Sequence, residues 1–296
     1  MYYLIYSFVY LHALLPLRIL YVFSDFLFYV VYYVVGYRKK IVRKNLTDSF
    51  PEKSTEKIIE TEKKFYRHFC DYIVETIKLA HISDEEMKKR MIFKNVDLIN
   101  QIMADNRSCI MLLGHYGNWE WVPSVCLYLK KNFFTGQIYH PLSNKAVDKL
   151  MLKLRGRFGT KNITTNDTFR EIVKMKRAGR QFIIGFISDQ SPMYNDIHYV
   201  THFLNQENTP MITGYERIAG QMDFIVVYLD VIKLNRGHYE AEYKVITEHP
   251  KECADFEITE KYTREMEKTI LRNPAYWLWT HRKWKHKKSI GIQNRT

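Results

Sequence analysis

The stretch CIMLLGHYGNWE, residues 109–120, begins with five apolar residues that stop at Gly114 and continues at once into polar ones. A short apolar run that ends at a glycine is typical of a strand buried on both faces of a sheet. Two further runs, FIIGFI (182–187) and FIVVYL (224–229), have the same character. These three runs predict the central strands of a sheet covered by helices on both faces.

Segments with helical spacing lie before, between and after the predicted strands. Ser83 precedes Asp84-Glu85-Glu86, as an N-cap with acids in the first turn does, and the segment from Ser54 is rich in Glu, Lys and apolar residues at helical spacing. The helices are expected at 54–79, after Ser83, 96–103, 144–156, 168–178, 208–221 and 260–271, with an edge strand at 238–245. Strands that alternate with helices indicate an α/β fold. With no repeat or linker visible, residues 37–296 are expected to form one domain.

The first 36 residues differ from the rest of the chain because they are almost wholly apolar and aromatic. Arg18 and Asp25 interrupt this segment, and no basic stretch precedes it, so a removable signal peptide fits poorly. The segment forms one imperfect spanning helix, two apolar helices in the membrane interface or, with less support, a buried pair of core helices. Its many tyrosines and phenylalanines favour a membrane anchor over residues 1–36.

The charge of the protein is strongly basic and unevenly placed. Lys and Arg number 45 against 32 Asp and Glu, a formal net charge of +13, and none of this excess lies in the first 36 residues. Five of the seven residues at 38–44 are basic, and the stretch 268–296 contains no acid. Trp277, Trp279 and Trp284 accompany the second cluster, and we expect both clusters to face anionic lipid head groups. A tail that binds nucleic acid is the alternative for the second cluster, and simple solvated charge is the third interpretation.

The composition excludes several classes of protein. Hydrophobic residues make up 46% of the chain, which excludes wholesale disorder. The four cysteines lack metal-type spacing, and Cys109 and Cys126 lie in apolar runs, so a secreted disulfide scaffold is not expected. His198 and His202 are four residues apart, but nothing nearby completes a metal site.

Polar residues follow two of the three apolar strands, where sites form in open α/β sheets. His115 follows the first strand between Gly114 and Gly117, and Glu120 comes five residues later. Because that offset does not place the two on one helical face, we expect a loop that leads into a helix at Asn118 and folds Glu120 back toward the imidazole. A carboxylate on one ring nitrogen makes the other a better base.

No nucleophile accompanies this pair, since the chain has no G-x-S-x-G elbow and no cysteine beside the loop. A histidine–carboxylate pair of this kind activates a hydroxyl of the substrate or water, which indicates acyl transfer to an alcohol or hydrolysis. A structural histidine at a strand end is the alternative to a catalytic one. A membrane-tethered basic binding protein is a further hypothesis, and it predicts that His115 is dispensable.

The loop GHYGNWE closely resembles the H-x4-E motif of the late acyltransferases of lipid A biosynthesis, which belong to the H-x4-D/E glycerolipid acyltransferase superfamily. Four further motifs match in the same order, and the apolar start of the chain also looks like that of the family. The matching motifs are Tyr139–Asn144, Arg155–Gly159, Asp189-Gln190 and Leu278–Lys285, together with Asn45-Leu46 and Phe50-Pro51 near the start. Five motifs in order make the resemblance specific, and it extends over nearly the whole chain.

The resemblance implies a glycerolipid-acyltransferase-like mixed sheet flanked by helices, with a hydrophobic membrane-anchoring segment at 1–36 and an acyltransferase domain at 37–296. The reaction implied is transfer of a fatty acyl chain from an acyl carrier protein to a hydroxyl of lipid A or its precursor. Another lipid, such as a phospholipid, a glycolipid or an amino-acid lipid, is the alternative acceptor. No cofactor, metal or nucleic acid is required, and the cytoplasmic side of the inner membrane is the expected location.

The same resemblance suggests roles for individual residues. His115 is expected to take the proton from the acceptor hydroxyl, with Glu120 orienting it. Arg155 and Arg157 are expected to bind phosphate or developing charge, since a guanidinium matches phosphate in a bidentate manner. The remaining two residues, Asn118 and Asp189, are expected to support the loop and to shape the site or hold an arginine.

Overall fold

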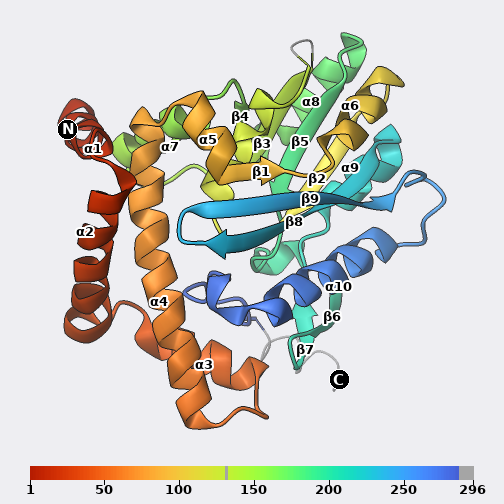
Figure 1. The fold of residues 1–296 in the computed structure, drawn as a ribbon. Helices are drawn as coiled ribbons and strands as arrows, with labels where there is room; N and C mark the ends of the chain where they lie inside the picture. The colour runs from red at the N-terminus through yellow and green to blue at the C-terminus, as the bar shows by residue number, and fades with distance from the viewer. Residues whose placement is uncertain (131–132, 287–296) are drawn as a thin grey trace.

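The computed structural model describes residues 1–130 and 133–286 (Figure 1). A seven-stranded sheet forms its centre, with the strand order β1-β9-β8-β2-β5-β3-β4. The strands are β1 (Met91–Phe93), β2 (Cys109–Leu113), β3 (Phe134–Tyr139), β4 (Lys161–Thr164), β5 (Phe182–Ile187), β8 (Ile225–Asn235) and β9 (His238–Thr247). All neighbours are parallel except β8 and β9, which form an antiparallel hairpin. The mixed α/β fold expected from the sequence is confirmed.

The three apolar runs are the three adjacent central strands, β8, β2 and β5. All five residues of β2 are buried, as a strand covered on both faces requires. The expectation of an edge strand at 238–245 is wrong, because β9 pairs with β8 on one side and with the short β1 on the other. A separate antiparallel pair, β6 (Val200–Phe203) and β7 (Gln206–Pro210), lies beside α10.

Ten α-helices surround the sheet in the described part of the chain. They are α1 (Tyr2–Ala13), α2 (Leu17–Tyr29), α3 (Lys39–Ser49), α4 (Thr55–Lys78), α5 (Asp84–Arg90), α6 (Val96–Ala104), α7 (Lys145–Arg155), α8 (Thr168–Arg177), α9 (Gly214–Met222) and α10 (Glu257–Arg272). The Ser83 side chain accepts a hydrogen bond from the first turn of α5, so the predicted cap is confirmed, and the structure adds a second cap, Ser54, at the start of α4. The predicted helix 208–221 begins later, because residues up to Pro210 pair as β7.

Short helical turns complete the described secondary structure. They are a π-helical turn η1 (Val30–Val35) that continues α2, and the 3₁₀ turns η2 (Leu79–His81), η3 (Trp119–Leu127), η4 (Thr165–Asp167), η5 (Tyr194–Asp196) and η6 (Pro274–Tyr276). The segment that follows His115 therefore opens as a 3₁₀ helix. Asn118 is its N-cap residue by position, but its side chain makes no capping hydrogen bond.

The apolar N-terminus packs along one side of the domain. Helix α2 runs beside α4, and α1 contacts both α4 and α7 (Figure 1). Leu20, Ser24 and Phe28, which recur every four residues, are buried on the side of α2 that faces α4. The opposite side exposes large apolar residues, and Leu17–Val35 is long and apolar enough to cross a membrane by length and composition alone.

Candidate active site

His115 and Asp189 meet because they follow two neighbouring parallel strands, β2 and β5. Asp189 Oδ1 lies 2.7 Å from His115 Nδ1, and Asp189 Oδ2 accepts the backbone N–H of His115 at 3.0 Å. A carboxylate can only accept hydrogen bonds, so the proton between them lies on Nδ1. In the neutral ring the other nitrogen, Nε2, is therefore the acceptor, the tautomer that a general base at Nε2 requires.

Asp189 is buried and held in its ionised form. Trp277 Nε1 donates to its Oδ2 at 2.7 Å, in addition to the two hydrogen bonds from His115. Burial by itself raises the pKa of this carboxyl, but the charge of His115 and the three donors outweigh burial and lower it to about 2. The imidazole thus faces a permanent negative charge.

Two glycines let the loop take this path. A Cβ on Gly114 would lie 2.4 Å from the end of the Met266 side chain, which would have to shift, and in ordinary contact, at 3.4 Å, with Asp189 Oδ2. Gly117 has a φ of +61°, in the left-handed region that favours glycine. Its carbonyl accepts a hydrogen bond from His68 Nε2 at 3.2 Å, and its N–H donates to Tyr276 O at 3.0 Å.

Glu120 does not contact His115 in this structure, and its expected role in orienting the imidazole stays a prediction. Glu120 is buried and accepts two hydrogen bonds from Arg155, at 2.7 and 2.6 Å, with Tyr72 Oη donating at 3.3 Å. Both ring nitrogens of His115 have other partners, Asp189 on Nδ1 and Gln190 Nε2 at 3.3 Å on Nε2. The 3₁₀ turn aims Glu120 at α7, which ends at Arg155.

Asn118, expected to bind substrate or support the loop, is fully buried beneath it. Its Nδ2 donates to Glu75 Oε2 at 2.7 Å, and Tyr239 Oη donates to the same oxygen at 2.8 Å. Burial raises the pKa of Glu75, against the lowering effects of Lys233 and of these two donors. Asn118 therefore supports the loop from within and does not face a ligand.

Neither of the expected phosphate ligands is free to serve as one here. Arg155 is engaged by Glu120, and Arg157 donates to the backbone carbonyls of Leu79, at 2.9 Å, and Ile82. Asp189 holds His115 and makes no described ion pair with an arginine.

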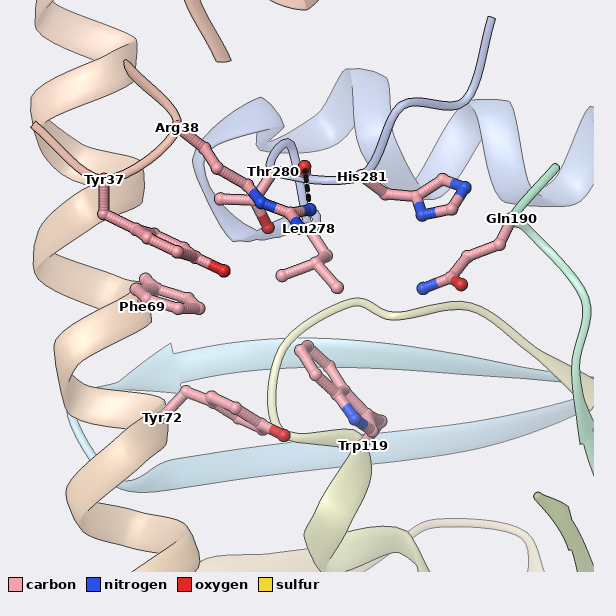
Figure 2. Close-up of a pocket in the computed structure, with 9 residues that line it drawn as sticks. All are labelled: Tyr37, Arg38, Phe69, Tyr72, Trp119, Gln190, Leu278, Thr280 and His281. Carbon is pink, nitrogen blue, oxygen red and sulfur yellow. Dashed lines mark hydrogen bonds between the residues drawn. The ribbon is translucent and has the colours of Figure 1, made fainter. Parts of the chain in front are cut away.

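Figure 2 shows a cavity of about 290 Å³ that includes two neighbours of His115 in its lining. Gln190, which contacts His115 Nε2, and Trp119, whose ring lies 5.1 Å from the imidazole, belong to its wall. The aromatic side of the cavity is made by Tyr37, Phe69, Tyr72 and Trp119 (Figure 2). The other side is polar, made by Arg38, Gln190, Thr280 and His281, with Leu278 among them. Gln190 and Trp119 thus connect this cavity to the histidine–carboxylate pair.

The C-terminal tryptophans do not form the expected membrane surface. Trp277 and Trp279 are buried, and Trp284 is partly buried with its Nε1 donating to Thr209 Oγ1 at 2.9 Å. Lys283 is also buried, and its Nζ donates to the carbonyls of Gln190 and Pro210. The tryptophans of this stretch therefore pack in the interior of the domain. Residues 287–296, with the last lysines of the basic cluster, lie outside the described residues.

Sequence reasoning missed several residues that build the site. Gln190 is one of them, although its position directly after the strand-end Asp189 is itself a signal of a site residue. Glu75 was detectable too, since it falls on the buried face of the amphipathic helix α4. Nothing in the sequence pointed to Arg38 or His281 as neighbours, because they lie far apart in the chain and meet only across the cavity.

An α/β sheet with a histidine–carboxylate pair at its strand ends, beside an aromatic cavity, defines a class of enzymes that activate a hydroxyl. Comparison with known proteins places the chain within that class. The family model described as bacterial lipid A biosynthesis acyltransferase matches residues 1–286. The chain therefore belongs to this family and is an acyltransferase. A lipid A biosynthesis acyltransferase 2 from Shigella flexneri is 23% identical over 251 residues, covering 83% of this chain and 77% of the relative.

Proposed function

We propose that the protein transfers a fatty acyl chain from an acyl carrier protein to a hydroxyl of lipid A or its precursor, with His115 as general base. The observation that carries the proposal is the imidazole itself, whose Nδ1 donates to Asp189 and whose Nε2 contacts Gln190, a residue that lines the cavity. Family membership supports lipid A chemistry. The acyl carrier protein thioester is proposed as the donor because the sequence motifs of the chain resemble those of the family.

The geometry supports a direct transfer. In the first step, Nε2 of His115 takes the proton of the acceptor hydroxyl while its oxygen attacks the thioester carbonyl carbon. Asp189, already ionised, stabilises the imidazolium that forms. When the tetrahedral intermediate collapses, the carbon–sulfur bond breaks, and the imidazolium returns its proton to the departing thiolate. No covalent acyl-enzyme is formed, and Gln190 has to move from Nε2 to admit the hydroxyl.

The N-terminal helices support a location at the cytoplasmic surface of the inner membrane. Exposed apolar residues of α1, α2 and η1 form one face, and the basic segment 38–44 follows it directly. The other face of α2 is tied to the domain by Ser24 Oγ, which donates to Asp71 at 2.7 Å, and by Asp25, which pairs with Arg236 at 2.7 Å. A helix with charged partners on one side suits the interface better than the bilayer centre, where charges are costly.

The direct test is an assay of the purified protein with acyl-acyl carrier protein and a panel of lipid acceptors, with products identified by mass spectrometry. We expect the wild-type protein to add an acyl chain to lipid A precursors and His115→Ala to add none. Acylation of a phospholipid, glycolipid or amino-acid lipid but of no lipid A precursor would reassign the acceptor. Release of free fatty acid alone would make the enzyme a hydrolase.

A further inference from the structure

Arg38 is the arginine that faces the cavity beside His115. It lines the polar wall, where its Nη1 donates to the carbonyl of Thr280 at 3.1 Å (Figure 2). Among residues 1–130 and 133–286, no carboxylate lies within ion-pairing distance of it. The residue is exposed and its guanidinium also lies 5.6 Å from the centre of the Tyr37 ring, so donors remain for a ligand in the cavity, since a guanidinium has five N–H groups.

The backbone holds Arg38 at this position. The residue adopts a left-handed φ of +51° directly before α3 begins at Lys39. Its carbonyl accepts the N–H groups of Ile41 and Val42, so the turn is part of the start of the helix. The first turn of α3 contains no acidic residue, and the positive end of its dipole adds to the charge of the guanidinium.

His281 contributes a second donor to the same wall. Its Nε2 accepts the backbone N–H of Ser191 at 3.2 Å, so the proton of the neutral ring lies on Nδ1. Burial lowers the pKa of His281 to about 4, which keeps the ring neutral near pH 7. In Figure 2 the other ring nitrogen points toward the cavity, on the side of Arg38 and Gln190.

At Arg38 and His281 the polar wall thus offers a ligand only hydrogen-bond donors. The positive charge of the Arg38 guanidinium has no carboxylate to balance it among the described residues. Phosphate is the ligand chemistry that this combination fits, because its oxygens accept several hydrogen bonds and a guanidinium binds them in a bidentate manner. The opposite wall is aromatic and suits the carbon skeleton of an amphiphile. Gln190 links this end of the cavity to His115 Nε2.

We propose that Arg38 and His281 form a phosphate-binding site for a phosphorylated substrate of His115. This inference rests on the proposed function for the identity of the reaction, and it replaces Arg155 and Arg157, which the fold uses internally. The phosphate belongs either to the lipid acceptor or to the phosphopantetheine arm that presents the thioester. Both sources present anionic phosphate oxygens to the site, from a monoester on the lipid or from the diester that joins the arm to its carrier.

Arg38→Gln tests the proposal, with Lys40→Gln as the matched control, because Lys40 is an exposed cation two residues away that does not line the cavity. The first arm measures the KM of a lipid A precursor and of its dephosphorylated form. The second measures the KM of an acyl-4′-phosphopantetheine and of the acyl-pantetheine that lacks the phosphate. We expect Arg38→Gln to raise KM at least about tenfold for the phosphorylated member of one pair and to leave its dephosphorylated partner nearly unchanged. The pair that responds identifies the source.

A binding measurement separates this inference from the proposed function. Calorimetric titration of the same four ligands, in detergent micelles, into His115→Ala protein with and without Arg38→Gln requires no turnover. If the wild type transfers no acyl chain but Arg38→Gln still weakens phosphate-dependent binding, the reaction is wrong and the site stands. Arg38→Lys, which keeps the charge and loses the bidentate geometry, is expected to restore part of the affinity even if Arg38→Gln lowers thermal stability. Equal effects of Arg38→Gln and Lys40→Gln, or no preference of the protein for either phosphorylated ligand, would overturn the proposal.

Discussion

Among the individual residues of the site, two carboxylates that the sequence places near His115 have different partners in the structure. Asp189 contacts the imidazole, whereas Glu120 neutralises Arg155. The spacing of His115 and Glu120 in the sequence could not decide this, because a 3₁₀ turn and an α-helix aim the fifth residue in different directions. The partner of His115 comes from the next strand in the sheet, 74 residues away.

The Glu120–Arg155 pair predicts a large loss of stability when only one partner is removed. Glu120 is 2% exposed, so Arg155→Met leaves a buried charge without compensation. We expect the free energy of unfolding to fall by about 3–5 kcal/mol in Arg155→Met. Denaturant titration in detergent measures this loss, and the double variant Glu120→Gln with Arg155→Met should be more stable than Arg155→Met alone. A double variant that is less stable would contradict the pairing.

At the scale of elements, the C-terminal segment after α10 is part of the site. Leu278 N–H donates to the carbonyl of His115 at 3.0 Å, Trp277 donates to Asp189, and Lys283 donates to the carbonyl of Gln190 at 3.2 Å. The central strands, the main helices and the Ser83 cap were predictable from periodicity and capping residues. The roles of the residues after α10 were not predictable, because a basic and tryptophan-rich stretch has the same composition on a membrane surface as in a polar core.

Lys283 predicts a specific dependence of stability on pH. Burial lowers its pKa to about 7, with Asp189 acting in the opposite direction, whereas a lysine in the unfolded chain has a pKa of about 10.4. Between about pH 7 and pH 10 the unfolded chain binds a proton that the folded protein does not, so the free energy of unfolding gains up to about 1.4 kcal/mol per pH unit from this residue. Below pH 7 the lysine is charged in both states and contributes no slope.

Lys283→Met removes this group, and denaturant titrations from pH 6 to pH 10 compare it with the wild type. We expect the difference in unfolding free energy between the two proteins to stay constant below about pH 7 and to change with pH above it. Parallel curves throughout would show that Lys283 is charged in the folded protein.

At the scale of the whole molecule, the N-terminal helices join two surfaces. Their inner face packs on α4, whose residue Glu75 holds the catalytic loop through Asn118. Their outer face exposes residues such as Phe8, Phe23 and Phe26. Composition predicted an apolar anchor over residues 1–36, but the division of α2 into a packed and an exposed face depends on α4 and could not be inferred from its own sequence.

The exposed face predicts membrane binding that can be reduced without unfolding the protein. Phe23 and Phe26 are 51% and 70% exposed, so Phe23→Glu with Phe26→Glu should fold normally. We expect flotation with anionic vesicles to show at least about tenfold weaker binding, because each phenylalanine loses its apolar contact with lipid. Phe169→Glu is the control, since Phe169 is also 51% exposed but lies on α8, away from this face. Equal losses in the two proteins would contradict the proposed membrane face.

The central claim, that Asp189 rather than Glu120 sets the basicity of His115, is tested most directly by the pH profile of kcat/KM. The acidic limb of that profile reports protonation of the general base in the free enzyme. For Asp189→Asn we predict a limb displaced to lower pH and a plateau roughly 10³–10⁴-fold below the wild type, because the imidazolium loses its adjacent charge. For Glu120→Gln we predict an acidic limb at the wild-type position, whatever the height of its plateau. A limb that moves in Glu120→Gln and stays in place in Asp189→Asn would contradict the account.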